Sequence, residues 1–597
     1  MKNKIVLFLS ALILSLIPYS FAFADEIPVI SLSLGGASIN DIQHDERLTL
    51  SSCNIDGNEF TEITTCQIKG RGNSTWTYEQ KPYQIKFDSK QDLFGLGAAK
   101  KWVLLANYTD ASKLRNDTAL YIGNRLGIEG TQPGVFINLY INNEYRGIYY
   151  LVHQVENSKT SINLENENGI LVEMDNFSNR EADDIYRYGV DGSRLVVKDA
   201  YDTDNISLTT ASLERFVSKY DSVYQAAERG DWDYLSQNVD IHSAVAMYFI
   251  NNFSANVDGG ISSFYMYQDG ENDLIHFGPV WDFDYSFGNR TWYDGATDQS
   301  NTSRDWTYGE IRKTFPEDSW EYEFENSIVK VNKLFSLMMD IDSFKSMVID
   351  IYNNEFKEII VSTIDREKHI AIDIEKSAIN TNSKYQIGSF EDESDYLMHW
   401  IDARLEYFNV LYSNPVNNIK DSNYKIKIDG AETNAKITNI GNGYYTIQVN
   451  DRYLTALDEK FETKEIWSRS AIHGDRSYWS PRFVNGDIVF LNKQSGRYLS
   501  FKNGIWYETS IFDSSCCIKL PQTIMHELLG FILGDVNLNG FVNIVDAQIA
   551  YDVSNGLYNG KEIYSQLFNL SDVNGDWYVD AADAFAIQHF VVYHSWN

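Results

Sequence analysis

Between residues 26 and about 200, short strand-like runs of mainly apolar residues alternate with turns, and this pattern is typical of β-structure. The clearest runs cover residues 83–87, 135–141 and 147–152. Asn142-Asn143-Glu144 separates the last two runs and is typical of a tight hairpin turn. This part of the chain is therefore predicted to be mainly antiparallel β-structure.

A helical period follows the strand-like runs. Apolar residues recur every three or four positions over residues 208–253 and again over residues 324–412. One earlier helix is predicted over residues 112–126, with Asp110 as its cap. A β-rich half followed by an α-rich half predicts an α+β domain over residues 26–412, with a cleft between two lobes.

Short strand-like runs return over residues 425–520. The tripeptide Arg-Tyr-Leu occurs at 452–454 and at 497–499, and Asn-Gly pairs punctuate the runs as turn signals. The pattern predicts a small all-β module, and its repeated strands loosely resemble a β-trefoil. Such a module either binds glycans through exposed aromatic residues, here Trp479 or Trp506, or is a spacer whose aromatic residues are buried.

The N-terminus has the pattern of an export signal. Lys2 and Lys4 precede an apolar run over residues 5–18, and Ala22-Phe23-Ala24 offers a cleavage site. We therefore expect a signal peptide over residues 1–24 and a secreted, extracellular protein. The apolar run is shorter than the roughly 20 residues that span a bilayer, and no later run reaches that length, so no membrane span is expected after cleavage.

Composition narrows the possible partners. The net charge of −34 over 597 residues argues against nucleic acid and against anionic membranes, which both require clustered lysine and arginine. The four cysteines form no disulfide framework, although Cys53 and Cys66 lie close enough in sequence to close one loop in an oxidising compartment. The length predicts several domains, and a monomer is the simplest assembly.

Two segments near the C-terminus repeat with the spacing of a calcium-binding loop. Oxygen-bearing side chains recur at loop positions one, three, five, nine and twelve, which is the pattern of an EF-hand-like site. The predicted ligands are Asp535, Asn537, Asn539, Asn543 and Asp546 in the first loop, and Asp572, Asn574, Asp576, Asp580 and Asp583 in the second. Two Ca²⁺ ions are therefore expected.

These loops resemble the type I dockerin family, because aspartate occupies position twelve and a single helix follows each loop. The resemblance covers residues 532–597 and implies an α-helical module that binds a cohesin of a cellulosome scaffoldin, a setting associated with polysaccharide degradation. The family's recognition pairs correspond to Ile544-Val545 and Ala581-Ala582. Position six is Gly540 in the first loop but Trp577 in the second, which predicts weaker binding at the second site.

Several motifs of the α+β domain fall where its cleft is predicted. One is Arg71-Gly-Asn-Ser-Thr-Trp76, and another, Trp281-Asp-Phe-Asp-Tyr-Ser-Phe-Gly288, carries two carboxylates two positions apart. Asp282 and Asp284 are therefore candidate ligands of a divalent cation. Asp258, on a predicted turn, is a candidate for orienting a hydroxyl group.

Taken in order, these motifs resemble the CotH family of atypical, kinase-like proteins. The resemblance also rests on Lys101-Trp-Val-Leu-Leu-Ala-Asn107 and Leu171-Val-Glu-Met-Asp175. It implies a two-lobed kinase-like fold that binds ATP with Mg²⁺ or Mn²⁺ and phosphorylates protein Ser/Thr. The implied roles are nucleotide contact for Lys86, catalysis for Asp258, metal binding for Asp282, and phosphate or structural contacts for Arg71 and Arg115. One departure is Ser263, which stands where kinases have a metal-binding asparagine.

Three functions therefore remain open. The first is an extracellular phosphotransferase carried on a cellulosome-like scaffold, with neighbouring proteins as phosphoacceptors. The second is a catalytically silent structural or adhesive component that uses the kinase-like fold as an interaction surface. The third is a glycan-binding protein, which depends on the all-β module.

Overall fold

The computed structural model describes most of the chain between residues 27 and 593. The described residues are 27–56, 58–59, 66–175, 184–256, 259, 262–289, 333–412, 419, 421–428, 431–441, 443–456, 463–484, 487–509, 514–519, 536, 542–557, 571, 573 and 579–593. The predicted signal peptide lies outside these residues. No helix among them is long and apolar enough to cross a membrane.

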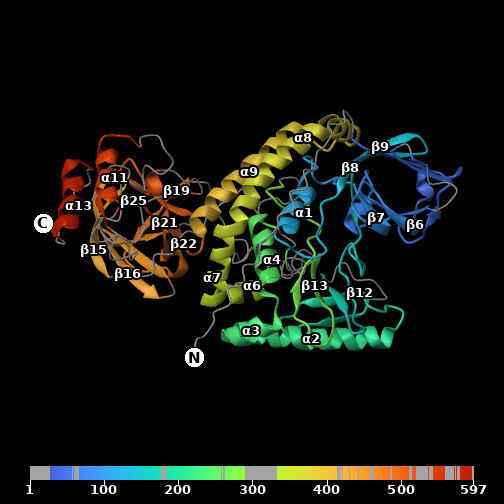
Figure 1. The fold of residues 1–597 in the computed structure, drawn as a ribbon, viewed down its shortest axis with the longest axis horizontal. Helices are drawn as coiled ribbons and strands as arrows, with labels where there is room; N and C mark the ends of the chain where they lie inside the picture. Colours follow the sequence, from blue (N-terminus) through green and yellow to red (C-terminus); the bar gives the residue numbers. More distant parts are fainter. Residues whose placement is uncertain are drawn as a thin grey trace, which may run out of the picture.

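Residues 29–153 form a nine-stranded first sheet, drawn in blue to cyan in Figure 1. Its strand order is β2-β5-β6-β7-β9-β8-β1-β3-β4, and all pairs are antiparallel except β1 with β8. The strands are β1 (Val29–Ser33), β2 (Leu48–Thr49), β3 (Ser52–Ile55), β4 (Asn58–Glu59), β5 (Cys66–Gly70), β6 (Tyr83–Asp92), β7 (Ala98–Leu105), β8 (Val135–Ile141) and β9 (Glu144–His153). The predicted strands over 83–87, 135–141 and 147–152 are thus confirmed, and Asn142 and Asn143 form their hairpin turn with positive φ angles.

The first sheet curls on itself. β2 and β3 lie near opposite ends of the strand order, yet only Leu50 and Ser51 separate them in the chain. The Leu50 amide donates to the Cys66 carbonyl of β5 at 2.9 Å, and the Ser51 amide donates to the Ser33 carbonyl of β1 at 2.8 Å, which ties the two ends together. Cys53 and Cys66 are both buried inside the curl, and a hydrogen bond with Cys53 raises the pKa of the Cys66 thiol.

A second, five-stranded sheet has the order β11-β12-β10-β13-β14. Its strands are β10 (Ile170–Met174), β11 (Tyr186–Tyr188), β12 (Arg194–Ala200), β13 (Phe264–Gln268) and β14 (His276–Phe277). Helix α2 (Ile206–Arg229) lies along one face of this sheet, where Phe216 packs in one core with Val172 and Leu195 (Figure 1). The opposite face carries Glu173 and Tyr265, which are register partners.

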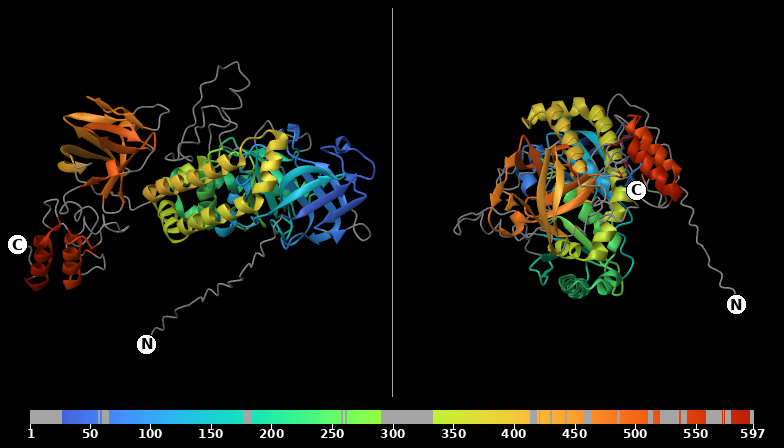
Figure 2. Two further views of the ribbon diagram at one scale, coloured as in Figure 1. Left: turned by 90° about the horizontal axis from the view of Figure 1, so that it is seen from above. Right: turned by 90° about the vertical axis from the view of Figure 1, so that its left-hand side faces the viewer.

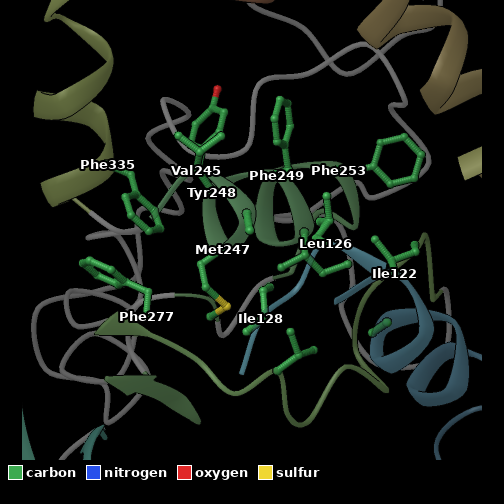
Figure 3. Close-up of a cluster of buried hydrophobic side chains, with 14 of the residues drawn as sticks. Ile122, Leu126, Ile128, Val245, Met247, Tyr248, Phe249, Phe253, Phe277 and Phe335 are labelled. Carbon is green, nitrogen blue, oxygen red and sulfur yellow. The ribbon is translucent and has the colours of Figure 1, made fainter. Parts of the chain in front are cut away.

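Helix α4 (Ile241–Phe253) runs through the centre of the domain. All residues of α4 except His242 are buried, as expected for a helix that is apolar on all sides. Figure 3 shows Phe249 and Phe253 of α4 among apolar side chains of other segments, including Ile122 and Phe335. The remaining helices around this core are α1 (Arg115–Arg125), α3 (Trp232–Asn238), α6 (Lys333–Met339), α7 (Asp342–Ile351), α8 (Lys357–Tyr385) and α9 (Phe390–Leu411), with a π-helical turn at Tyr352–Phe356.

The expected helix over residues 112–126 begins later than predicted. Lys113 has a φ of +64°, a left-handed conformation that no α-helix contains, so α1 begins at Arg115. Asp110 nevertheless acts near the start of α1, because its carboxylate accepts hydrogen bonds from the amides of Ser112 and Arg115, both at 3.0 Å. The mixed α+β character of the domain is confirmed.

The β module of residues 419–519 contains a ring of six strands. β17 pairs with β21, β21 with β22, β22 with β25, β25 with β15, β15 with β16, and β16 with β17. The strands are β15 (Ser422–Ile428), β16 (Ala431–Gly441), β17 (Tyr444–Val449), β18 (Arg452–Thr455), β19 (Thr463–Glu465), β20 (Trp467–Arg469), β21 (Trp479–Val484), β22 (Asp487–Asn492), β23 (Tyr498–Lys502), β24 (Ile505–Thr509) and β25 (Ile518–Lys519). Trp479 and Trp506 are both buried, so the structure supports the alternative in which the aromatic residues of this module belong to its core.

The β module packs on the end of α9. Buried Arg482 of β21 donates from Nε to the Leu411 carbonyl at 2.9 Å. The ring centres of Tyr407 on α9 and Tyr498 on β23 lie 6.3 Å apart. Beyond the module, α11 (Ile544–Ser554) and α13 (Ala581–Tyr593) lie side by side, drawn in red in Figure 2. Ala550 and Ile587 belong to their shared core.

The two thiols inside the curl of the first sheet lead to a testable prediction. Protein isolated from an oxidising compartment should contain a disulfide between Cys53 and Cys66, formed as both thiols give up their protons and two electrons to an oxidant such as oxidised glutathione. The bond should raise the free energy of unfolding by about 3 kcal/mol, because it closes a short loop. Thermal unfolding with and without reductant measures this difference, and Cys53→Ser is the control that should not respond to reductant. Equal unfolding temperatures for the wild type in both conditions would contradict the prediction.

Candidate functional site

The segment 281–288 turns between buried and open positions. Phe283 and Phe287 are buried in the main core. Asp282, which directly precedes Phe283, is exposed to solvent. Asp282 reaches this position because its backbone is left-handed, with a φ of +66°. A non-glycine residue in this conformation costs roughly 1–2 kcal/mol, so the surrounding contacts must hold it there.

Buried hydrogen bonds fix the segment on both sides of Asp282. The Phe283 amide donates to Asn116 Oδ1 at 2.8 Å, and the Phe287 amide donates to the Ser254 carbonyl at 2.6 Å. Upstream, the Val280 amide donates to Thr131 Oγ1 at 2.9 Å. Helix α1, Thr131 and the end of α4 therefore position the candidate site by accepting hydrogen bonds from main-chain amides of residues 280–287.

Arg115 is part of this support. Its side chain is fully buried, donates from Nε to the Ser286 carbonyl at 3.1 Å, and forms an ion pair with Asp110. Its remaining contacts are with Ser112 Oγ at 3.2 Å and Glu393 at 3.5 Å. The sequence suggested either a phosphate or a structural contact for Arg115, and these partners give it a structural setting.

Side chains from four segments surround Asp282, and we call them the Asp282 cluster: the charged Arg71, Glu173 and Lys198, and the uncharged Ser263 and Tyr265. Ser263 Oγ donates to the Asp282 carboxylate at 3.1 Å. Although Asp282 is open to solvent, crowding by protein atoms raises the pKa of its carboxyl, and the nearby Glu173 raises it further. Arg71 and the bond from Ser263 act in the opposite direction.

Arg71 links the first sheet to this cluster. It follows β5, its guanidinium lies 5.4 Å from the centre of the Trp281 ring, and its burial lowers its pKa while the charge of Asp282 raises it. A cation stacked on an indole ring and attracted by a nearby carboxylate keeps a preferred direction. The prediction that Arg71 lies near Asp282 in the cleft is consistent with this position.

The second sheet contributes an ion pair to the cluster. Lys198 Nζ donates to Glu173 Oε2 at 2.9 Å, and the Lys198 ammonium lies 5.6 Å from the centre of the Tyr265 ring. Burial, and then the adjacent Glu173, raise the pKa of Tyr265 well above its ordinary value. The three side chains share one face because Glu173 and Tyr265 are cross-strand partners, and Lys198 lies two residues along β12 from Val196, the partner of Glu173.

Two consecutive serines bind two carboxylates beside each other. Ser262 Oγ donates to Asp175 at 3.0 Å, and Ser263 Oγ donates to Asp282 at 3.1 Å. Ser263 has a φ of +51°, so its backbone is also in the left-handed region. Ser263, which departs from the kinase pattern, thus holds the candidate metal-binding aspartate instead of providing an amide ligand.

Asp284 has different partners from those of Asp282. It is buried and its carboxylate accepts from Thr109 Oγ1 at 2.5 Å, while its carbonyl accepts from Asn289 Nδ2 at 2.6 Å. In the part of the chain that the structure describes, no group of three or more His, Cys, Asp or Glu side chains has the arrangement of a metal site. Asp258, the predicted catalytic residue, lies outside the described residues.

Lys86 lies on β6, where its cross-strand partners are Gln67 and Lys101. Lys101 forms an ion pair with Glu156 at 2.5 Å. The side chains that the structure gathers around Asp282 do not include Lys86. The lysine of the Asp282 cluster is Lys198, which no sequence motif indicated, whereas Glu173 and Asp175 lie within the motif at residues 171–175.

The chemistry of the Asp282 cluster suits a divalent cation and phosphate groups. Carboxylate oxygens, here from Asp282 and Glu173, are the ligands that Mg²⁺ and Mn²⁺ prefer. Guanidinium and ammonium groups, here from Arg71 and Lys198, are the common partners of phosphate oxygens. Both kinds of group meet within one cluster, so the residues present fit a metal-bound nucleotide.

The two C-terminal helices begin in the same way. Asp546 accepts from the Asn543 amide at 2.9 Å, and Asp583 accepts from the Asp580 amide at 3.0 Å. The other six predicted calcium ligands, Asp535, Asn537, Asn539, Asp572, Asn574 and Asp576, lie outside the described residues. Of the predicted cohesin-recognition residues, Ile544 and Val545 are 56% and 52% exposed. Ala581 and Ala582 at the start of α13 are exposed as well.

Comparison with known proteins gives one finding for the α+β domain. Residues 68–408, which are more than half of the chain, match the family model described as CotH kinase protein. No curated protein matches the chain.

The close approach at the end of the segment gives a stability prediction. Gly288 has a φ of +72°, and an added Cβ would lie 2.4 Å from Trp400 Cδ1. Gly288→Ala should therefore lower the free energy of unfolding by about 2–4 kcal/mol, the sum of a strained backbone and an overpacked core. Gly230→Ala is the matched control, because Gly230 has a φ of +67° but no atom within 4 Å of the new Cβ. Urea unfolding of both variants measures the difference, and equal losses would show that Trp400 does not restrict this position.

Proposed function

The chain belongs to the CotH kinase protein family, and from that premise we propose that it is an ATP-dependent phosphotransferase acting on Ser/Thr hydroxyls of neighbouring extracellular proteins. The observation that carries the proposal is the Asp282 cluster, where a strained aspartate meets Arg71 and the Glu173–Lys198 ion pair. Strained backbone at a charged, solvent-open position is typical of functional sites. A fold kept only for structure has no need of an exposed aspartate held in this way.

Each residue has a proposed role. Asp282, held by Ser263, is the metal ligand, and Asp284 supports it from the buried side. Arg71 and Lys198 contact the phosphates, while Glu173 orients Lys198 through their ion pair. Bound ATP supplies the phosphoryl group, and its metal ion neutralises the charge that develops during transfer. Asp258 remains the residue proposed to accept the proton of the attacking hydroxyl.

Two lysines compete for the role of phosphate ligand. The family resemblance suggests Lys86, on the strand of the first sheet, and the contacts of the Asp282 cluster favour Lys198. Arg115 is proposed to act through position alone, because its buried guanidinium already donates to Asp110, Ser112, Ser286 and Glu393. The two lysines can be separated by substitution.

Calorimetry with ATP and Mg²⁺ or Mn²⁺ tests the nucleotide site. Wild-type protein should bind ATP only with metal present, and Asp282→Ala should abolish metal-dependent binding. Lys198→Met should weaken binding at least about ten-fold, or about 1.4 kcal/mol, whereas Lys86→Met should change it less. If neither wild type nor any variant binds nucleotide, the domain is instead a catalytically silent structural or adhesive component.

We further propose that residues 532–597 form a calcium-dependent dockerin that attaches the secreted protein to a scaffoldin cohesin. The matching starts of α11 and α13 support a repeated loop-and-helix unit, and the exposed Ile544-Val545 pair supports an apolar contact with the cohesin. For the β module, the ring of six strands is compatible with a trefoil-like barrel. The buried Trp479 and Trp506 remove its two candidate glycan contacts.

Calcium titration tests the dockerin proposal. The full chain should bind two Ca²⁺ ions, the second more weakly because Trp577 replaces glycine in its loop. Asp546→Ala should remove the tighter site, since Asp546 is both a predicted ligand and the partner of the Asn543 amide. Asp552→Ala, which changes a carboxylate on the same helix away from the loop, is the control. Retention of two sites in Asp546→Ala would refute the assignment of the first loop.

A further inference from the structure

Strand β11 forms one edge of the second sheet. Among the described residues it pairs only with β12. Tyr186 and Tyr188 on this strand are 40% and 52% exposed, and Val190 just beyond it is 52% exposed. Natural proteins usually protect a strand edge, because its free amide and carbonyl groups attract other extended chains. An edge that is open and aromatic is therefore suited to binding an extended segment.

The backbone amide and carbonyl groups of Tyr186 and Tyr188 point away from β12. The Val197 amide donates to the Ile185 carbonyl at 2.9 Å, and the Gly189 amide donates to the Ser193 carbonyl at 2.9 Å. In an antiparallel pair the bonded residues alternate, so Tyr186 and Tyr188 direct their amides and carbonyls outward. The Tyr186 carbonyl accepts from the exposed Arg187 side chain at 2.9 Å, a surface contact that an incoming amide can replace.

The tyrosine side chains share a face with the Asp282 cluster. In register across the sheet lie Tyr186 on β11, Val196 on β12, Glu173 on β10 and Tyr265 on β13. Paired residues of neighbouring strands point to the same face. Strands are about 4.8 Å apart, so the Tyr186 position is about 10 Å from the Glu173 position. A chain lying beside β11 is one strand farther out, about 14 Å from the Glu173 position, on the same face of the sheet.

The charges around β11 favour some segments over others. Four carboxylates and two guanidinium groups contact this strand or the residues next to it: Asp184, Asp191, Glu214, Asp221, Arg187 and Arg194. The local excess of negative charge agrees with the net charge of −34 for the whole chain. An acidic segment is repelled here, and one with lysine or arginine is attracted.

We propose that the open edge of β11 is the docking site for the phosphoacceptor, which binds there as an added strand of extended polypeptide. The inference rests on the proposed phosphotransferase function and assigns its acceptor a place and a mode of binding. Main-chain hydrogen bonds to Tyr186 and Tyr188 hold the segment, and their rings contact its side chains. A hydroxyl-bearing residue about four positions beyond the added strand can then span the roughly 14 Å to the Asp282 cluster.

Binding can be tested without nucleotide, so its outcome is independent of catalytic activity. The full-length chain is applied to an array of immobilised short peptides, each with a central serine and varied flanks. The strongest binder is resynthesised as a fluorescent peptide, and its affinity is measured by anisotropy. Hydrogen exchange on the complex should show slowed exchange at the Tyr186 and Tyr188 amides. Methylating alternate backbone nitrogens of the peptide should weaken binding about ten-fold or more.

Two variants and one control complete the experiment. Tyr188→Pro removes an outward-facing amide without removing a bond to β12, and proline is tolerated at such edge positions. Tyr186→Ala with Tyr188→Ala removes the rings. Both variants should bind the peptide about ten-fold more weakly or worse, while ATP binding stays unchanged. Tyr551→Ala, which removes a tyrosine that is 50% exposed on α11, should bind the peptide as the wild type does.

Several results would overturn the proposal. One is the absence of any peptide that binds, and another is equal peptide binding by the wild type and both β11 variants. A wild-type dimer that Tyr188→Pro converts to a monomer would assign the edge to a second copy of the chain. Slow exchange at the Tyr186 and Tyr188 amides before peptide is added would show that another segment of the same chain already covers the edge.

Discussion

At Asp282 the backbone is left-handed, and hydrogen bonds of the neighbouring residues hold it in this conformation. Phe283 is tied to Asn116 on α1 and Phe287 to the end of α4, with both phenylalanines in the central core. The carboxylate of Asp282, which directly precedes Phe283, therefore faces outward, toward Ser263 and Arg71. The cost of this conformation, roughly 1–2 kcal/mol, is small beside the burial of two phenylalanine side chains. Core packing thus determines where the candidate metal ligand points.

The remainder of the site depends on the same arrangement. The second sheet presents Glu173 and Lys198 on the face that Asp282 reaches, and the first sheet supplies Arg71 from the residues after β5. Arg115 secures the far end of the segment by binding the Ser286 carbonyl from inside the core. Because its partner Asp110 is also fully buried, loss of either residue would leave an uncompensated buried charge. The buried Arg115–Asp110 pair that supports the segment is therefore distinct from the charged residues of the Asp282 cluster, although both adjoin residues 281–288.

The sequence predicts what is decided locally. A short, mainly apolar run identifies β8 at its observed bounds, and two asparagines identify the hairpin turn before β9. The start of α1 was misplaced because the left-handed Lys113 leaves no trace in hydrophobic periodicity. The cleft motifs indicate Arg71 and Asp282, whose charges the structure places close enough to interact. The motifs do not indicate Lys198 and Tyr265, because these residues join the cluster only through the pairing of β10 with β12 and β13.

The central claim is that the Asp282 cluster is a metal–nucleotide site, and its most direct test is a crystal structure with Mn²⁺ and a non-hydrolysable ATP analogue. Anomalous scattering from manganese locates the metal independently of any interpretation of the nucleotide density. The account predicts a manganese peak at the Asp282 carboxylate, with the phosphates of the analogue beside Arg71 and Lys198. A manganese peak at another place in the domain, or a nucleotide bound away from the second sheet, would contradict it.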